Sequence, residues 1–100
     1  MSTLTRRIKE ARLQAGLSQE ELGIRIGIDP ASASTRMNRY ELGRRVPHLE
    51  VVERLAEELR FPVAFFYAAE DDEADLLVKY SKLSIDQQKM LISYLNSLLS

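Results

Sequence analysis

The side chains that could do chemistry in this sequence are hydrogen-bonding groups gathered between residues 31 and 41. If Ala33, Met37 and Tyr40 face a core at i, i+4 and i+7 of a helix, the opposite side of that helix is polar. Arginine is the usual partner of guanine, asparagine can pair with adenine, and threonine offers a methyl group or a hydroxyl. That opposite side presents Ala31, Thr35 and Asn38, flanked by Ser32, Ser34 and Arg39, and these polar side chains suit hydrogen bonds to base edges. The alternative interpretation is a solvated helix face with incidental polar residues.

Catalysis and metal binding find little support in the sequence. The chain has no cysteine, a single histidine, no glycine-rich phosphate loop and no obvious carboxylate pair. The lack of cysteine removes disulfides, thiol nucleophiles and thiolate metal ligands together. The lone His48, between Pro47 and a predicted helix, is interpreted as a surface or capping residue. We therefore expect no enzymatic activity, no cofactor, no metal and no small-molecule ligand.

The net charge of −1 conceals a division between the two halves of the chain. Residues 1–48 contain nine Lys and Arg against five acids, whereas residues 49–100 contain five against ten. A basic half joined to an acidic half is typical of a protein that meets phosphate with one end only. Chance clustering of charges on solvated faces is the competing explanation.

Helices must position the polar face, and the sequence predicts only helices. Ser18 with Glu21, and Ser84 with Gln87, are capping boxes that open two of them. Asp29-Pro30 opens another, since proline suits the first helical position. The predicted helices span residues 4–15, 18–26, 30–41, 49–59, 63–67, 70–82 and 84–99. With 100 residues and no apolar stretch of signal-peptide or membrane-spanning type, we expect one modest core in a cytoplasmic protein.

Two short helices joined by a glycine-containing turn form the scaffold that puts the second helix into a DNA major groove. The motifs here, in order along the chain, are Arg12-Leu-Gln-Ala-Gly-Leu-Ser-Gln-Glu-Glu-Leu22, Gly27, Tyr40-Glu-Leu-Gly43, Pro47 and the segment 49–59. Together they resemble the phage-repressor-like (Xre/Cro type) helix-turn-helix family over residues 4–67. This resemblance implies an all-α fold, a five-helix repressor-like DNA-binding domain in residues 1–69, followed by a C-terminal helical extension in residues 70–100.

The chain departs from the family pattern at two places. Gly23 stands where the family usually has alanine, at a point of close helix packing. The stretch from Gly27 to Glu41 is about four residues longer than usual, which is close to one helical turn. Either the recognition helix is longer, or the turn is longer and the helix begins near Ser34.

The resemblance also assigns roles to individual residues. Counting back from Glu41 along the family pattern selects Ser34, Thr35, Asn38 and Arg39 for base contacts. Gln19 looks like the family's phosphate-contacting glutamine at a helix N-terminus. Arg12 and Glu41 match positions that form an ion pair, which makes Arg12 a brace between helices. Further phosphate contacts are expected from the basic residues around the motif, namely Arg6, Arg7, Arg36, Arg44 and Arg45.

The last thirty residues lie beyond the family domain. Leu91, Leu95 and Leu98 lie on a broad apolar face of the last predicted helix. This face is predicted to form a homodimer, since two operator half-sites need a two-fold partner. The alternative is that the helix folds back to cover the domain.

The sequence thus predicts a sequence-specific transcriptional regulator, a repressor, that binds double-stranded DNA as a homodimer. The competing hypothesis is a protein-interaction adaptor, or an antitoxin-like partner, built on the same fold. Weak DNA binding without sequence preference, together with a tight protein partner, would favour the adaptor.

Overall fold

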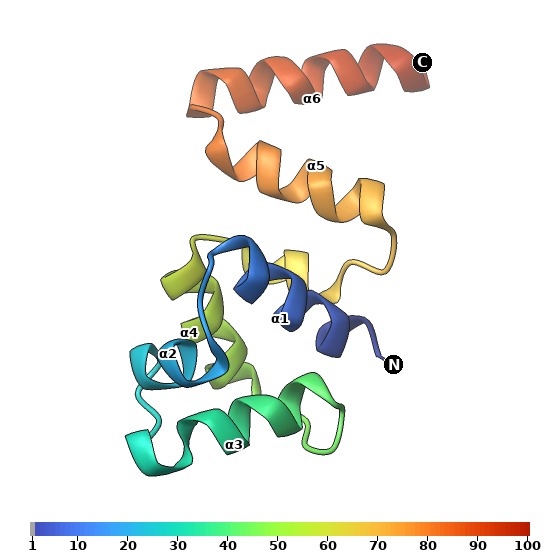
Figure 1. The fold of residues 1–100 in the computed structure, drawn as a ribbon. Helices are drawn as coiled ribbons and strands as arrows, with labels where there is room; N and C mark the ends of the chain where they lie inside the picture. Colours follow the sequence, from blue (N-terminus) through green and yellow to red (C-terminus); the bar gives the residue numbers. More distant parts are fainter. Residues whose placement is uncertain (1) are drawn as a thin grey trace.

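The computed structural model describes residues 2–100, and helices account for all of the regular structure in that range (Figure 1). The predicted all-α fold is confirmed. Ser2 caps the first helix, and both predicted capping boxes form, since Ser18 and Ser84 each accept from a backbone N–H three residues on. The helices are α1 (Thr3–Gln14), α2 (Gln19–Arg25), α3 (Pro30–Glu41), α4 (Leu49–Leu59), the 3₁₀ turn η1 (Val63–Tyr67), α5 (Asp71–Lys82) and α6 (Ile85–Leu99).

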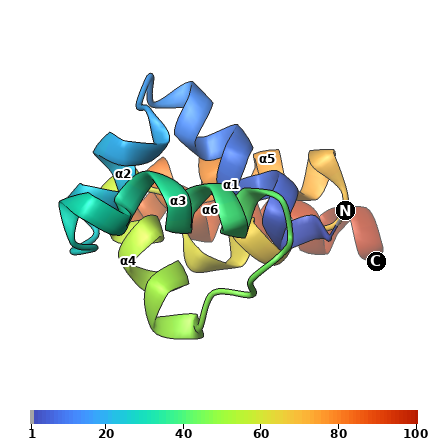
Figure 2. The same ribbon diagram turned by 60° about the horizontal axis from the view of Figure 1, so that its bottom comes forward.

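One hydrophobic core lies among α1, α2, α3, α4 and η1. Its fully buried side chains come from every one of these elements, as periodic apolar spacing on amphipathic helices requires. At one edge Phe65 stacks on Phe61 with 4.6 Å between the ring centroids, while Phe66 meets both rings edge-on. Figure 2 shows α3 crossing the front of this assembly, with α2 beside its first turns.

The turn between α2 and α3 is short, and α3 is long. Gly27 adopts φ +94, a left-handed conformation that residues with a Cβ rarely take, and it ends α2. After Ile28 and Asp29, α3 begins at Pro30 and continues for 12 residues. Asp29 occupies the N-cap position, although its side chain makes no capping hydrogen bond. The four additional residues between Gly27 and Glu41 therefore lengthen α3 and not the turn.

Gly23 allows α2 and α3 to touch. A Cβ built on Gly23 would lie 2.8 Å from the Cβ of Ala33 and 3.0 Å from its carbonyl oxygen. Both atoms belong to a helix backbone or are attached directly to it, so neither can move without shifting α3. Packing at this site therefore favours glycine, because a methyl group on residue 23 would push α3 away from α2.

Replacing Gly23 by alanine is expected to destabilise the protein by about 1 kcal/mol. The gain in helix propensity is about 1 kcal/mol, and overpacking a close contact costs roughly 1–3 kcal/mol. Urea unfolding of the variant and the wild type measures the change in the free energy of unfolding. The double variant Gly23→Ala/Ala33→Gly removes the Cβ–Cβ clash and should regain part of the loss. An increase in stability for Gly23→Ala alone would contradict the close approach.

α5 and α6 project from the core as an antiparallel pair, which we call the C-terminal arm (residues 71–99). α5 is attached to the core by the buried Ala74 and the partly buried Leu77 and Val78. No residue of α6 (Ile85–Leu99) is buried. The arm gives the molecule its longest dimension of 53 Å and places α6 at the opposite end from α3 (Figure 1). In residues 2–100 no helix is long and apolar enough to cross a membrane.

Candidate nucleic-acid interface

α3 presents one buried face and one exposed polar face. Ala33 and Met37 are fully buried and Tyr40 is nearly so, as the helical spacing predicts. The exposed face holds the four side chains predicted to contact bases, Ser34, Thr35, Asn38 and Arg39. The core thus fixes the rotation of α3 about its axis and points these four side chains outward.

Arginine side chains surround a hollow on the exposed side of α3. The hollow has a volume of about 280 Å³ and lies beside the first turns of the helix. Arg45, from the turn after α3, closes it, and Arg44 is exposed next to Arg45. A guanidinium presents several N–H donors in a planar fork that matches phosphate oxygens or the guanine edge. The lining residues are Ala31, Ser32, Thr35, Arg36, Arg39 and Arg45.

Gln19 joins the start of α2 to the exposed side of α3. Its amide Nε2 donates to the Oδ1 of Asn38 at 3.2 Å and to the Oε1 of Glu41 at 3.2 Å. Asn38 is exposed, and its side-chain oxygen is held by this bond. Gln19 lies in the first turn of a capped helix, where backbone N–H groups favour an anion. The side chain of Gln19 therefore orients Asn38, and its contact with a phosphate stays a prediction.

Arg12 and Glu41 form a bidentate ion pair between α1 and the end of α3. Arg12 donates from Nε to Oε2 of Glu41 at 2.7 Å and from Nη2 to Oε1 at 2.9 Å. A third donor, Nη1, reaches the carbonyl oxygen of Leu17 at 2.9 Å. Glu41 is 3% exposed, and its hydrogen bond raises the pKa of Arg12. Arg12 therefore braces the fold from inside and lies off the exposed face of α3.

The sequence predicts a phosphate contact for Arg7, and the structure shows that this prediction is wrong. The Arg7 side chain is only 1% exposed and points into the junction between α1 and η1. Its Nε and Nη2 donate to the carbonyl oxygen of Ala68 at 3.0 and 2.9 Å. Arg6 binds Asp71 and the carbonyl oxygen of Ala69 at this junction but is 45% exposed, so its phosphate contact stays a prediction.

One sequence signal marks Arg7 as a buried residue. It lies three residues after Leu4 and four before Ala11, on the same side of α1 as the core positions Ile8 and Ala11. A charged residue on an apolar stripe predicts either a buried partner or a break in the stripe. The carbonyl acceptors lie more than sixty residues away along the chain, so the sequence pattern does not identify them.

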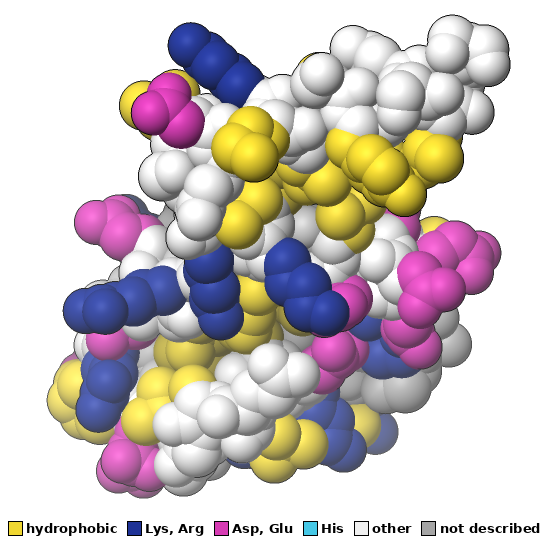
Figure 3. All heavy atoms as spheres, turned by 90° about the horizontal axis from the view of Figure 1, so that it is seen from above, with side chains coloured by type: hydrophobic (Ala, Val, Ile, Leu, Met, Phe, Trp, Pro, Cys, Tyr) yellow, Lys and Arg dark blue, Asp and Glu magenta, His cyan; other side chains and the backbone are white. Residues whose placement is uncertain are grey.

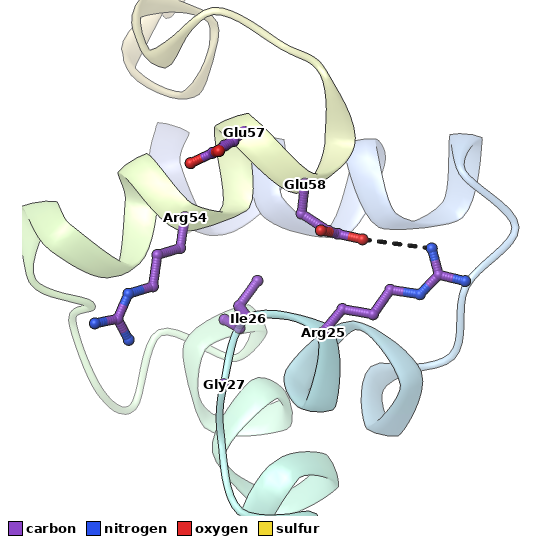
Figure 4. Close-up of a pocket in the computed structure, with 6 residues that line it drawn as sticks. All are labelled: Arg25, Ile26, Gly27, Arg54, Glu57 and Glu58. Carbon is purple, nitrogen blue, oxygen red and sulfur yellow. Dashed lines mark hydrogen bonds and ion pairs between the residues drawn. The ribbon is translucent and has the colours of Figure 1, made fainter.

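A second open hollow, of about 340 Å³, lies between the end of α2 and α4 (Figure 4). Arg25 reaches across it to Glu58 with an N–O distance of 3.5 Å, and Arg54 extends away from that pair. The charged side chains that line it are all on the surface. In the part of the chain that the structure describes, no group of His, Cys, Asp and Glu could hold a metal ion. The α3 face is accordingly the strongest candidate site.

The capped α2, the tight glycine turn and the outward polar face of α3 define a helix-turn-helix DNA-binding protein. The comparisons with known proteins agree with this class. Residues 3–64 match the family model described as a helix-turn-helix domain, so the chain belongs to the helix-turn-helix domain family. This family consists of DNA-binding transcriptional regulators and not of enzymes.

The chain is also similar to a solved structure over its full length. The crystal structure of transcriptional regulator BswR matches with 41% sequence identity and a TM-score of 0.88. The match covers 99% of this chain and 96% of that chain, so it includes the C-terminal arm as well as the helix-turn-helix domain. A comparison with curated proteins finds no match.

Proposed function

We propose that this protein is a sequence-specific transcriptional regulator of the Xre/Cro type, which binds double-stranded DNA with α3 in the major groove and acts as a repressor. The observation that carries this proposal is the exposed polar face of α3. Ser34, Thr35, Asn38 and Arg39 extend from a helix whose rotation is fixed by its buried side. An α-helix fits the major groove, where each base pair presents a distinct pattern of donors and acceptors.

Repression needs no surface beyond the one that binds DNA. A bound protein occludes its operator from other proteins, whereas activation requires an additional contact. The described residues form a helix-turn-helix and a two-helix arm, and occlusion by such a domain is the simplest mode of action. A chromosomal target also places the protein where the DNA is, which we propose to be the cytoplasm.

The backbone contacts in this proposal come from Gln19, Arg36, Arg44 and Arg45. The three arginines lie along α3 or directly after it and supply the positive charge facing the DNA. Each phosphate neutralised by a side chain releases counterions, so the affinity falls as the salt concentration rises. Loss of one such arginine should weaken binding to all sequences equally and reduce the salt slope by about 1.

The experiment that tests the function is selection of bound duplexes from a random library. The affinity for the enriched site is then compared with that for a scrambled duplex at two salt concentrations. A preference of at least about 10³-fold, with steep salt dependence, supports a sequence-specific regulator. A reporter gene placed behind the enriched site should be repressed. Equal, weak binding to both duplexes would reject the proposal and favour an adaptor that acts through a protein partner.

We also propose that the protein is a homodimer joined through α6. Large apolar side chains on this helix are exposed, with Met90 at 70%, Leu98 at 62% and Leu99 at 86%. Leu91 and Leu95 are half-buried. At about 3.6 residues per turn the apolar positions of α6 spread over more than half of its circumference, and a helix of that kind is normally buried.

α5 covers at most one side of α6. We propose that a second copy of the chain covers the apolar side chains of α6 that α5 leaves exposed. Figure 3, seen from the α6 end of the molecule, shows hydrophobic side chains gathered in a strip on this face. The surface is far from α3, so dimer contacts and DNA contacts do not compete (Figure 1). A two-fold axis along the length of the molecule would put both α3 helices on one side, for half-sites about 34 Å apart. The division into residues 1–69 for DNA and 70–100 for dimerisation follows from this arrangement.

Replacing Leu91, Leu95 and Leu98 together by serine is expected to convert the dimer into a monomer. The helix-turn-helix core does not include these residues, so a monomer should keep its α-helical spectrum and its weak affinity for a single half-site. Sedimentation analysis measures the mass, and Ser93→Ala on the polar side of α6 is the control. If the wild-type protein is monomeric at micromolar concentration, the homodimer is excluded.

A further inference from the structure

A buried arginine connects the helix-turn-helix domain to the C-terminal arm. The guanidinium of Arg7 donates to the carbonyl oxygen of Ala68 through two nitrogens, and Nη2 also lies 3.4 Å from the carbonyl oxygen of Ala69. These carbonyls belong to the segment that links η1 to α5. The ring of Phe65 lies beneath the guanidinium, 5.5 Å from its central carbon. One side chain of α1 thus binds the segment that connects the core to α5.

Asp71 completes the connection from the other side. As the first residue of α5, it accepts hydrogen bonds from Arg6 Nη1 at 2.8 Å and from Arg7 Nη1 at 3.0 Å on the same Oδ1 atom. These bonds lower the pKa of Asp71, the bond from Arg6 having the larger effect. Glu10, one turn further along α1, accepts from Arg7 Nη1 at 2.9 Å. We call Arg6, Arg7, Asp71 and the carbonyls of Ala68 and Ala69 the arginine clamp.

The chemistry of the clamp requires arginine. Arg7 directs its donors at two backbone carbonyls and two carboxylates at once, and the planar fork fixes the directions of these bonds. Lysine carries the same charge on a compact ammonium group that cannot match four acceptors in one plane. The Arg7 side chain is 1% exposed, so its bonds to the backbone carbonyls are shielded from water, whereas the Asp71 and Glu10 carboxylates are 80% and 36% exposed. The directional hydrogen bonds of the clamp therefore fix the angle between α1 and α5. The apolar contacts of Ala74, Leu77 and Val78 hold α5 against the core but are non-directional and do not fix this angle.

A small change of that angle has a large effect at a distance. α3 and α6 lie at opposite ends of a molecule 53 Å long, with the clamp between them (Figure 1). In a dimer joined through α6, a tilt at the clamp moves each α3 in proportion to its distance from the clamp. Half-sites on DNA are separated by whole helical turns, so the two helices must keep a fixed separation.

We propose that Arg7 is a positioning residue that locks the arm onto the helix-turn-helix domain and thereby sets the operator half-site spacing that the dimer accepts. The first part concerns a single chain, and the second part rests on the proposed homodimer and its DNA binding. The partner concerned is a two-half-site operator of one spacing. A flexible arm would instead accept several spacings with similar affinity.

Spin labels test the first part without DNA. The chain contains no cysteine, so Glu53→Cys on α4 and Asn96→Cys on α6 give two labels at exposed positions. Dilution with excess unlabelled protein leaves only the distance within one chain. The wild-type background should give a narrow distance distribution, and Arg7→Lys and Arg7→Met should broaden it. Asp71→Asn should broaden it less, because the Ala68 and Ala69 bonds remain.

Asp75→Asn is the matched control for Asp71→Asn. Asp75 lies on α5 and pairs at 2.7 Å with Lys79 of the same helix, so its loss breaks an exposed pair that does not reach α1. The distribution of label-to-label distances in the Asp75→Asn protein should match that of the wild type. If Arg7→Met does not fold, Arg7→Lys and Asp71→Asn still decide the question. A distribution as narrow as the wild type in folded Arg7→Lys and Asp71→Asn proteins would overturn the locking role.

Operators with inserted or deleted base pairs between the half-sites test the second part. The wild type should bind one spacing best, and Arg7→Lys should reduce its preference over the altered spacings by about tenfold, within the usual range of coupling between linked sites. Affinity for a single half-site should not change. An unchanged spacing preference in Arg7→Lys would reject the spacing role. A wild type without any operator preference would reject the proposed function instead, and the distance measurement would still decide whether the clamp locks the arm.

Discussion

Replacing Glu41 by alanine is expected to lower the free energy of unfolding by roughly 3–5 kcal/mol, the range for breaking one partner out of a buried ion pair. Glu41 is 3% exposed and accepts two hydrogen bonds from Arg12, which itself is 11% exposed. Its loss leaves the Arg12 guanidinium buried with one remaining carbonyl acceptor, that of Leu17. Urea unfolding followed by circular dichroism measures the change.

Two controls separate the buried charge from the loss of a side chain. Arg12→Met/Glu41→Leu removes both charges and should recover much of the stability, because a buried ion pair is often replaceable by apolar residues. Glu58→Ala breaks a surface pair of 3.5 Å with Arg25 and should cost no more than about 1 kcal/mol. Equal effects of Glu41→Ala and Glu58→Ala would show that the brace does not hold α1 to α3.

Replacing Asn38 or Arg39 by alanine is expected to weaken binding to the selected operator by about 1–3 kcal/mol for each side chain that no longer reaches a base edge. Both side chains are exposed on α3, and Arg39 also lines the arginine-surrounded hollow. Because a homodimer carries the change in both half-sites, the double variant should bind the operator little better than a scrambled duplex. Competition binding of the two duplexes measures how far the preference falls.

Three variants distinguish base contacts from the alternatives. Arg45→Ala removes a proposed phosphate-backbone contact and should weaken binding to the operator and the scrambled duplex alike. Arg54→Ala removes an equal charge from α4, away from α3, and should leave the preference unchanged. Gln19→Ala frees the Oδ1 of Asn38 and should reduce the preference in part. Unaltered operator preference in both Asn38→Ala and Arg39→Ala would remove these residues from the proposed contacts.

Local signals in the sequence accounted for most of the helix boundaries. Side-chain caps satisfy backbone groups within three residues, so Ser18 and Ser84 mark helix starts without any knowledge of the rest of the fold. Gly27 ends α2 for an equally local reason, its left-handed conformation. The rotation of α3 follows from apolar periodicity, which placed Ala33, Met37 and Tyr40 in the core. Since the rotation decides which side chains point outward, the candidate DNA-binding face could also be predicted.

The tertiary structure alone decided the features that depend on residues far apart in the chain. The apolar spacing of α1 places Arg7 on the core side, but its acceptors on Ala68 and Ala69 come from a segment about sixty residues away, which no local pattern identifies. The sequence also left open whether the four extra residues extended the turn or α3, because a helical turn and a loop of that length are alike in composition. The structure decides this, because α3 begins at Pro30, directly after the short turn of Gly27, Ile28 and Asp29. Local chemistry therefore determined the helices and the polar face of α3, while contacts between distant segments determined the burial of Arg7 and the attachment of the arm.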